Sequence, residues 1–575
     1  MSNSSAEQRN ISAEKIVFTA IATIIILLQI GFCLFQICSF FQSGQHGIVG
    51  AGEQIAIRNT IKHRILFPAP YYSGESKPPK HEIKTDSPPA MHLLNTLSVL
   101  IFGDNEIAVR IPSAFFSILS MLMLLILTAK HFSKKISILA SAIYLFLPIN
   151  TVFCNMPNRF SACIFFSLLM FDGYLSWVKN GKTNRLIECL IGTTCCILFD
   201  WSGYVLATCM AISAFYKGFE PCRNGENRVR KELFLSLSVL IFIAITLKIY
   251  WIIIGKVSGS SNVLQIITAG GSTNTDIIST LKELNGKVIK TVFPASLKIL
   301  SLLWLATIIL NHALKKWKEE HLVPLSFFIA GIIKFFIFPS QSRYLFFWNQ
   351  EFAPFVSIAS ACIINSIPES INAILKLFKF PSAHPVVKAT IFYFLIIILF
   401  ITYIPQSSKK FITGRRTGGS FDSEDQNALY RKILFAEKVI SWTSPDYNIL
   451  IHPSFQHRIE FDFRLKDRII KTGSVSYIEE TKKSMLSLGG KVAIIGDFEK
   501  IDKTLVLQES KKHPFYIVDS NFFLDYGKNQ GSLKVFMLTP YKSGFLWKFF
   551  VTPFNPPMRL QRNTIMEERL MNNLQ

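Results

Sequence analysis

Long apolar runs alternate with short polar stretches over the first 405 residues. Each run holds about 18 to 22 residues, enough to cross the hydrocarbon core of a bilayer as a helix. About eleven such runs occur, at 16–40, 108–129, 135–153, 160–177, 184–199, 201–216, 232–254, 293–312, 323–338, 349–368 and 386–405. Asp200 and Trp201 alone separate the fifth run from the sixth, which indicates either a tight hairpin or one broken helix. The pattern predicts an α-helical polytopic membrane protein.

The pattern changes after residue 406, where charged residues become frequent and long apolar runs end. A helix is predicted over 422–441, and Ser476 to Glu479 forms a capping box for another that ends at Gly489 and Gly490. Strands are predicted at 448–452, 460–463, 492–496, 515–518 and 535–538. These elements predict two domains: a transmembrane domain over 1–405, including an outer segment 42–107, and a soluble α/β domain over 406–575. The aromatic stretch 545–550 with Phe554 fits either the membrane interface or the core of that domain.

The basic residues divide the short loops between the spans into two classes. Loops of one class hold Arg159 alone, Arg343 alone or no basic residue. The other class holds Lys130, Lys134 and Lys135; Lys179, Lys182 and Arg185; Lys217, Arg223, Arg228, Arg230 and Lys231; Lys315, Lys316 and Lys318; and Lys376, Lys379 and Lys388. Because Lys and Arg collect on the cytoplasmic side, the second class is predicted to be cytoplasmic. The N-terminus is then cytoplasmic, whereas segment 42–107, loop 255–292 and the C-terminal domain lie outside.

Composition agrees with this assignment. Half of the residues are hydrophobic and only 17% are charged, a balance that soluble domains seldom reach. The formal net charge of +23 follows the loops and no nucleic-acid motif accompanies it, so nucleic acid is excluded as a partner. The ten cysteines lie before the C-terminal domain without metal-ligand spacing. P-loop, GxSxG and HExxH signatures are absent, as is a Gly-rich dinucleotide loop after a strand.

The outer segment 42–107 is longer than an ordinary connection, which favours a functional role. It contains GAGEQIAIRN at 50–59, predicted to be a short interfacial helix, then SPP at 87–89 and FGDNEIAVRIPS at 102–113. PINTVFCNMPN at 148–158, FDWSGYV at 199–205 and FPSQSRYLFFW at 338–348 follow. In this order the motifs resemble the GT-C glycosyltransferases of the protein O-mannosyltransferase and aminoarabinose-transferase group. The resemblance covers about residues 40–370, and FGDNExAVRxPSA is its most specific part.

The resemblance implies a bacterial inner-membrane enzyme that moves a sugar from a polyprenyl-phosphate donor to a glycan, lipid or protein acceptor at the outer face, with inversion. It places an acid just after the first span, so Glu53 is the candidate catalytic base. The candidate substrate-binding residues are Arg58, Lys77, Lys80, His81, Lys84, Asp86, Asn158, Arg159, Asp200, Arg343 and Tyr344. The cations among them are candidates to neutralise the lipid phosphate or, as solvated groups, to attract anionic headgroups. Asp200 fits a donor cavity or a cap of the hairpin. No cofactor beyond the lipid-phosphosugar donor is assigned, and a divalent metal stays open.

The chain departs from the family pattern at several acids. Gly52 precedes Glu53 where the family has an acidic pair, Arg159 stands where a second acid is expected, and Ser87 replaces a histidine. A second hypothesis is therefore a catalytically degenerate GT-C-fold protein that binds a lipid-linked sugar or a partner. A third is a transporter, favoured by ionisable residues within the spans, namely Asp172, Lys248, Lys298 and Lys334.

Overall fold

The computed structural model describes most of the helical region and the strands near the C-terminus. The described residues are 2–35, 37–38, 45–69, 83–84, 87–218, 226–258, 290–314, 317–338, 342, 345–377, 387, 390, 393–394, 397, 401 and 403–410, then 448–451, 469–471, 492–496, 515–519, 533–539, 546–552 and 561–562. The chain divides into two compact units. One comprises Met1–Phe40 and Lys84–Asp422, and the other comprises Phe41–Ile83 and Ser423–Gln575. The predicted domain limits of 1–405 and 406–575 remain predictions.

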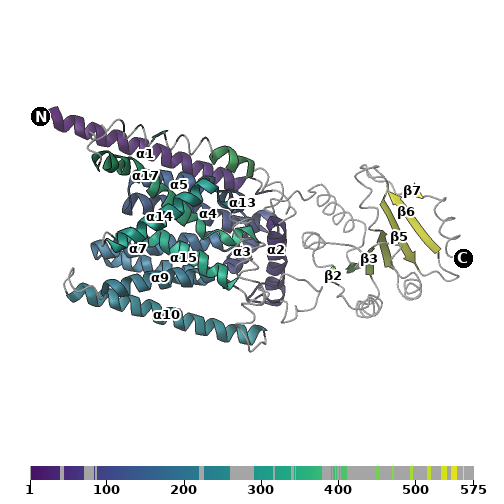
Figure 1. Ribbon diagram of the computed structural model, residues 1–575. Helices are drawn as coiled ribbons and strands as arrows, with labels where there is room; N and C mark the ends of the chain where they lie inside the picture. Colours follow the sequence, from purple (N-terminus) through teal and green to yellow (C-terminus); the bar gives the residue numbers. More distant parts are fainter. Residues whose placement is uncertain are drawn as a thin grey trace. The chain divides into compact units, whose positions relative to one another are not determined.

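The first unit is a helical bundle (Figure 1). Its helices are α1 (Ser2–Leu34), α3 (Ala90–Phe102), α4 (Glu106–His131), α5 (Lys134–Phe146), α6 (Pro148–Phe153), α7 (Phe160–Asn180), α8 (Thr183–Phe199), α9 (Trp201–Gly218), α10 (Glu226–Ser258), α13 (Lys290–Val292), α14 (Ala295–Ala313), α15 (Leu322–Ile337) and α17 (Phe352–Leu377), with 3₁₀ turns η3 (Glu319–His321) and η4 (Phe346–Asn349). Among the described residues seven helices are long and apolar enough to cross a membrane. They lie in α1, α4, α7, α10, α14, η3–α15 and α17. The predicted class, a polytopic α-helical membrane protein, is confirmed.

Several predicted spans differ in detail. The predicted span 135–153 is divided into α5 and α6, with Pro148 as the first residue of α6. A proline is tolerated in the first turn of a helix but interrupts the interior, which explains the break. The predicted span 184–199 is α8, which has 17 residues and is therefore shorter than the seven. Most of the predicted span 386–405 lies outside the described residues.

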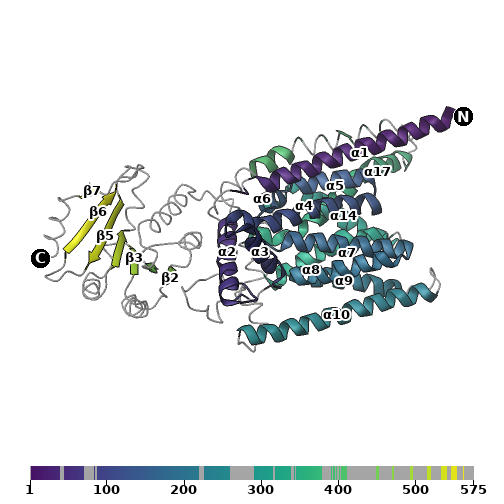
Figure 2. The same ribbon diagram turned by 180° about the vertical axis from the view of Figure 1, so that it is seen from behind.

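Helices α7, α8 and α9 run side by side (Figure 2). A Cβ at Gly173 of α7 would lie 2.5 Å from the backbone nitrogen of Cys189, and one at Gly192 of α8 would lie 2.5 Å from that of Met170. The two helices therefore approach backbone to backbone. Asp200 caps the end of α8 in an extended conformation, and α9 begins at once. A Cβ at Gly203 would collide with the Cys196 carbonyl, so α8 and α9 form the tight hairpin that was one of the two predictions.

The FGDNEIAVRIPS motif forms the turn between α3 and α4. Gly103 has a φ of +89°, a conformation that glycine adopts readily. The Asn105 side chain accepts a hydrogen bond of 2.9 Å from the Ala108 amide and so caps α4. Buried Arg110 donates to the Ile37 carbonyl at 2.7 Å, and Ser113 exchanges hydrogen bonds with the Asn158 backbone. The most specific motif of the sequence thus holds the scaffold together.

The second unit contains α2 (Gln45–His63) and a seven-stranded sheet. The helix predicted at 50–59 is confirmed within α2. The strands are β1 (Asn448–Ile451), β2 (Ile469–Lys471), β3 (Val492–Gly496), β4 (Phe515–Asp519), β5 (Leu533–Thr539), β6 (Leu546–Thr552) and β7 (Gln561–Arg562), in the order β2-β1-β3-β4-β5-β6-β7. The first four are parallel, and β5 to β7 add antiparallel pairs.

Four of the five predicted C-terminal strands are confirmed, as β1, β3, β4 and β5. The predicted strand at 460–463, the helix at 422–441 and the capping box at Ser476 lie outside the described residues. The aromatic stretch at 545–550 falls largely in β6, which pairs with β5 along its whole length. It is therefore part of the sheet.

Candidate functional site

Four charged residues from distant parts of the chain meet at one end of the helical bundle. Arg159 directly precedes α7, Asp200 joins α8 to α9, Lys334 lies in the last turn of α15, and Glu351 directly precedes α17. The distribution of Lys and Arg over the short loops predicts that all four residues lie at the non-cytoplasmic ends of their spans. The exposed fraction is 17% for the Arg159 side chain and 4% or less for the other three. We call these four residues the outer-end cluster.

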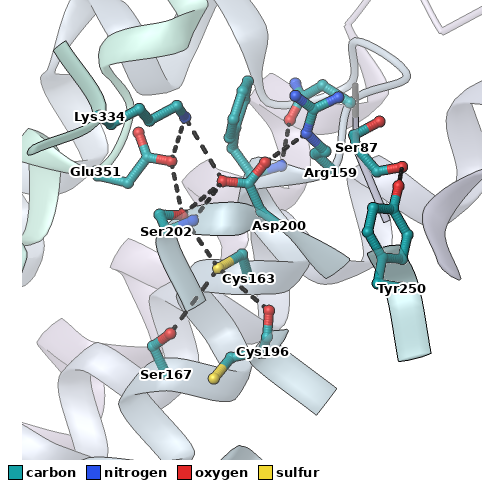
Figure 3. Close-up of polar contacts among 12 residues, drawn as sticks. Ser87, Arg159, Cys163, Ser167, Cys196, Asp200, Ser202, Tyr250, Lys334 and Glu351 are labelled. Carbon is teal, nitrogen blue, oxygen red and sulfur yellow. Dashed lines mark hydrogen bonds and ion pairs between the residues drawn. The ribbon is translucent and has the colours of Figure 1, made fainter. Parts of the chain in front are cut away.

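The four side chains of the outer-end cluster form a continuous chain of short polar contacts (Figure 3). Arg159 Nε donates to Asp200 Oδ2, and Lys334 Nζ donates to Glu351 Oε1. Lys334 Nζ also lies 3.7 Å from Asp200 Oδ1. Ser202 links the two carboxyl groups, because its Oγ is 2.7 Å from Asp200 Oδ1 and 3.0 Å from Glu351 Oε1. Its amide donates to the same Asp200 oxygen at 3.0 Å.

Aromatic rings surround the two cations. Lys334 Nζ lies 3.5 Å from the centroid of the Phe160 ring and 4.9 Å from that of Trp348. The Arg159 guanidinium lies 5.3 Å and 5.1 Å from the same two centroids. A ring face attracts a cation, and the attraction grows when water is excluded. The rings therefore stabilise the two positive charges beside them.

The pKa values of the Asp200 and Glu351 carboxyl groups are shifted in opposite directions. Burial alone would raise the pKa of Asp200, but Lys334, Arg159 and Ser202 outweigh it and lower that pKa to about 2. Burial raises the pKa of Glu351. Lys334 acts to lower this pKa, and the negative charge of nearby Asp200 acts to raise it further. Asp200 is consequently the stable anion of the cluster, whereas Glu351 is inclined to keep a proton. Such separation of two neighbouring carboxyl groups is typical of functional sites.

The SPP and FDW motifs meet beside the cluster. The Tyr250 hydroxyl in α10 donates to the Ser87 carbonyl, and the Tyr250 ring packs edge-on against Trp201 with centroids 5.0 Å apart. Figure 3 shows Ser87 and Tyr250 on the Arg159 side of Asp200. The start of α3 is thereby fixed next to the α8–α9 hairpin.

The predicted site residues fall into three groups. Asn158, Arg159 and Asp200 come together, and the Asn158 side chain accepts from the Phe160 amide and so orients Arg159. Glu53 and Arg58 are half-buried on α2 in the second unit, and Lys84 is exposed. Lys77, Lys80, His81, Asp86, Arg343 and Tyr344 lie outside the described residues. Their assigned roles remain predictions.

Two members of the cluster are absent from the predicted site residues. The sequence marks Lys334 only as an ionisable residue inside a span, and it does not single out Glu351. The signal for Glu351 is the polar run of Asn349, Gln350 and Glu351 between an aromatic stretch and an apolar helix. Asp172, marked in the same way as Lys334, pairs with Lys130 at 2.7 Å and His131 at 2.8 Å.

Within the described part of the chain no group of three His, Cys, Asp or Glu side chains is placed to hold a metal ion.

The helical bundle shares its fold with GT-C glycosyltransferases of solved structure. Residues 86–251 match the model of the dolichyl-phosphate-mannose-protein mannosyltransferase family, in agreement with the resemblance of the motifs. The structure of ArnT from Cupriavidus metallidurans bound to undecaprenyl phosphate is similar, with a TM-score of 0.51 at 11% identity over 91% of this chain and 96% of that one. The oligosaccharyltransferase AglB from Archaeoglobus fulgidus has a TM-score of 0.49 at 11% identity over 93% and 74%. A search of curated proteins finds no match.

Proposed function

We propose that this chain transfers a sugar from a polyprenyl-phosphate donor to an acceptor at the outer face of the bacterial inner membrane. The observation that carries the proposal is the outer-end cluster, in which buried Lys334 and half-buried Arg159 are held within a GT-C fold. The similar ArnT structure contains undecaprenyl phosphate, which supports a donor of this chemical class. The N-terminus is then cytoplasmic and the C-terminal sheet is periplasmic.

The proposed reaction is a single displacement. An acceptor hydroxyl oxygen forms a bond to the anomeric carbon while the bond from that carbon to the phosphate oxygen breaks, and the electron pair leaves with the polyprenyl phosphate. Glu53 takes the proton of the acceptor, and the configuration inverts. Negative charge grows on the departing phosphate, so fixed cations beside it stabilise the transition state.

The remaining assignments follow from charge. Arg159 is the most exposed member of the cluster and therefore the first cation that a phosphate would meet. Asp200 keeps Arg159 in place, and Asn158 orients it. Arg58, Lys77, Lys80, His81 and Lys84 are proposed to neutralise the phosphate, and Asp86, Arg343 and Tyr344 to contact the sugar or the acceptor.

The test uses full-length protein in proteoliposomes with a panel of polyprenyl-phosphate-linked hexoses and pentoses, and measures release of polyprenyl phosphate. Glu53→Gln should reduce turnover at least about a hundredfold, the usual scale for loss of a general base. Asp104→Asn serves as the control, because Asp104 is an exposed acid in the turn between α3 and α4. Full turnover by Glu53→Gln would refute the assignment of the base.

The degenerate-enzyme hypothesis has one specific observation in its favour. Arg159 occupies the position where the family pattern places a second acid, and it is bound to Asp200. Under this hypothesis the wild-type protein binds a polyprenyl-phosphate sugar but releases no polyprenyl phosphate with any member of the panel. The same experiment thus separates the two hypotheses.

A further inference from the structure

The hydrogen bonds around Ser202 do not balance if both carboxyl groups are ionised. Its Oγ lies within hydrogen-bond distance of Asp200 Oδ1 and Glu351 Oε1, but a hydroxyl has one hydrogen to donate. One of the two contacts would then bring two oxygen lone pairs together. A proton on Glu351 Oε1 resolves this, since that hydroxyl accepts from Lys334 Nζ and donates to Ser202, while Ser202 donates to Asp200. Asp200 is the poorer place for that proton, because Arg159 and the Ser202 amide already donate to it.

The second oxygen of Glu351 points to the same conclusion. Oε2 is buried and has no hydrogen-bond partner among the described residues, and the side chain is only 1% exposed. An ionised carboxylate would leave a charged acceptor without a donor, which costs far more than an unpaired neutral carbonyl oxygen. Burial and the proximity of Asp200 also raise the pKa of Glu351.

The charge of the cluster therefore depends on Glu351. The groups that face it are Lys334 from α15, Asp200 and Ser202 from the α8–α9 hairpin, and Arg159 beyond Asp200. The Cys163 thiol of α7 lies 3.4 Å from Ser202 Oγ. With Glu351 neutral, two cations and one anion remain and the cluster is positive by one unit. With Glu351 ionised, the cluster has no net charge and attracts a phosphate less.

We propose that Glu351 is a positioning residue of the transfer site, which carries a proton in the resting protein and so leaves Lys334 and Arg159 with a net positive charge for the donor phosphate. This rests on the proposed function, because the anion is the phosphate of the lipid donor. Phosphate binding and protonation of Glu351 are then linked: each favours the other. Above the pKa of Glu351 the affinity for the phosphate should fall by at most about tenfold per pH unit.

Binding of a polyprenyl monophosphate to the full-length protein in nanodiscs, measured from about pH 5 to about pH 8, tests the linkage. A phosphate monoester itself titrates near pH 6, so the informative quantity is the ratio of wild-type affinity to Glu351→Gln affinity at each pH. Glutamine mimics the neutral acid and removes the titration. We expect a ratio near one at low pH that falls as pH rises. Glu369→Gln, the same change at the far end of α17, should give a ratio near one throughout.

A ratio that does not change with pH, or a Glu351→Gln variant that binds several-fold more weakly at every pH, overturns the proposal. Uncharged polyprenol should bind wild type and Glu351→Gln equally, and a difference there would show that the substitution disturbs the fold. Infrared difference spectra of wild type against Glu351→Gln provide a readout that needs no lipid. The carbonyl band of a protonated carboxylic acid should be present at neutral pH. Its absence refutes the protonated Glu351 while leaving the proposed transferase intact, whereas a chain that binds no polyprenyl phosphate at any pH refutes both.

Discussion

Asp200 illustrates how one residue ties distant segments together. It lies between α8 and α9, binds Arg159 ahead of α7, and lies 3.7 Å from Lys334 of α15. A buried ion pair adds little net stability compared with apolar packing, but removal of one partner leaves an uncompensated charge. The loss of Asp200 should therefore cost more stability than its ion pairs contribute in the intact cluster.

Asp200→Asn should destabilise the protein by about 3 to 5 kcal/mol, because Arg159 and Lys334 then keep buried positive charge without their shared anion. The measurement is thermal unfolding of the purified protein in detergent, compared with wild type. Asp104→Asn, in the exposed α3–α4 turn, should unfold at the wild-type temperature. Equal unfolding temperatures for Asp200→Asn and wild type would show that the ion pairs contribute nothing.

The same residue should make stability depend on pH at the acid end. Folding lowers the pKa of Asp200 from its ordinary value of 3.8 to about 2, so the ionised form stabilises the native state. This contribution is complete above the unfolded value and is lost as pH falls from about 4 towards about 2. The difference in unfolding temperature between wild type and Asp200→Asn should therefore shrink over that interval. A difference that stays constant down to pH 2 would contradict the assignment.

The pH dependence of stability that Glu351 contributes has the opposite sign to that of Asp200, because folding raises the pKa of Glu351. The contribution of Glu351 to stability is present below its pKa in the unfolded chain and is lost as pH rises through its pKa in the folded protein.

The sequence identified Arg159 and Asp200 as site residues from motif positions. It did not identify Glu351, because Ser202 and Glu351 are 149 positions apart and no pattern in the residues around either one predicts their hydrogen bond.

At the scale of elements, glycines decide how closely helices pack. Gly173 and Gly192 each face the backbone of the partner helix, where no side chain can give way. Substitution of either by alanine should destabilise the protein by about 1 to 3 kcal/mol, the usual cost of overpacking. Gly31→Ala in α1 is the matched control, because a Cβ there meets nothing within 4 Å. Thermal unfolding of the three variants checks the expectation, and it fails if Gly31→Ala is as damaging as the other two.

Apolar periodicity was sufficient to find the long spans, because a run of about 20 apolar residues has few other stable environments. It was insufficient for the break at Pro148 and for α3 (Ala90–Phe102), which lies within the segment predicted to be an outer loop. In the sequence the motif FGDNEIAVRIPS is the most specific part of the family resemblance. The structure gives it a mechanical role, since Asn105 caps α4 and Arg110 binds the Ile37 carbonyl.

For the whole molecule, the two ends of the bundle differ in their ionic contacts. At the start of α7 the outer-end cluster joins four segments. Towards the other end of the same helix, Asp172 binds Lys130 and His131 of α4 and lies 3.7 Å from Arg185 of α8. These basic residues belong to loops predicted to be cytoplasmic. The orientation of α7 across the membrane therefore determines which side the outer-end cluster faces.

Labelling by a membrane-impermeant maleimide tests that orientation in intact cells. Asp104→Cys, in the turn between α3 and α4, should react from outside, whereas Lys182→Cys, directly after α7, should react only after the membrane is permeabilised. Both changes are made in a background where Cys38 and Cys222 are replaced by serine, because Cys38 is exposed and Cys222 belongs to a loop predicted to be cytoplasmic. Since Lys and Arg resist translocation, an inverted result would require the seventeen basic residues of the loops predicted to be cytoplasmic to have crossed the bilayer. It would also place Arg159 and Lys334 at the cytoplasmic surface, where the proposed transfer at the outer face is impossible.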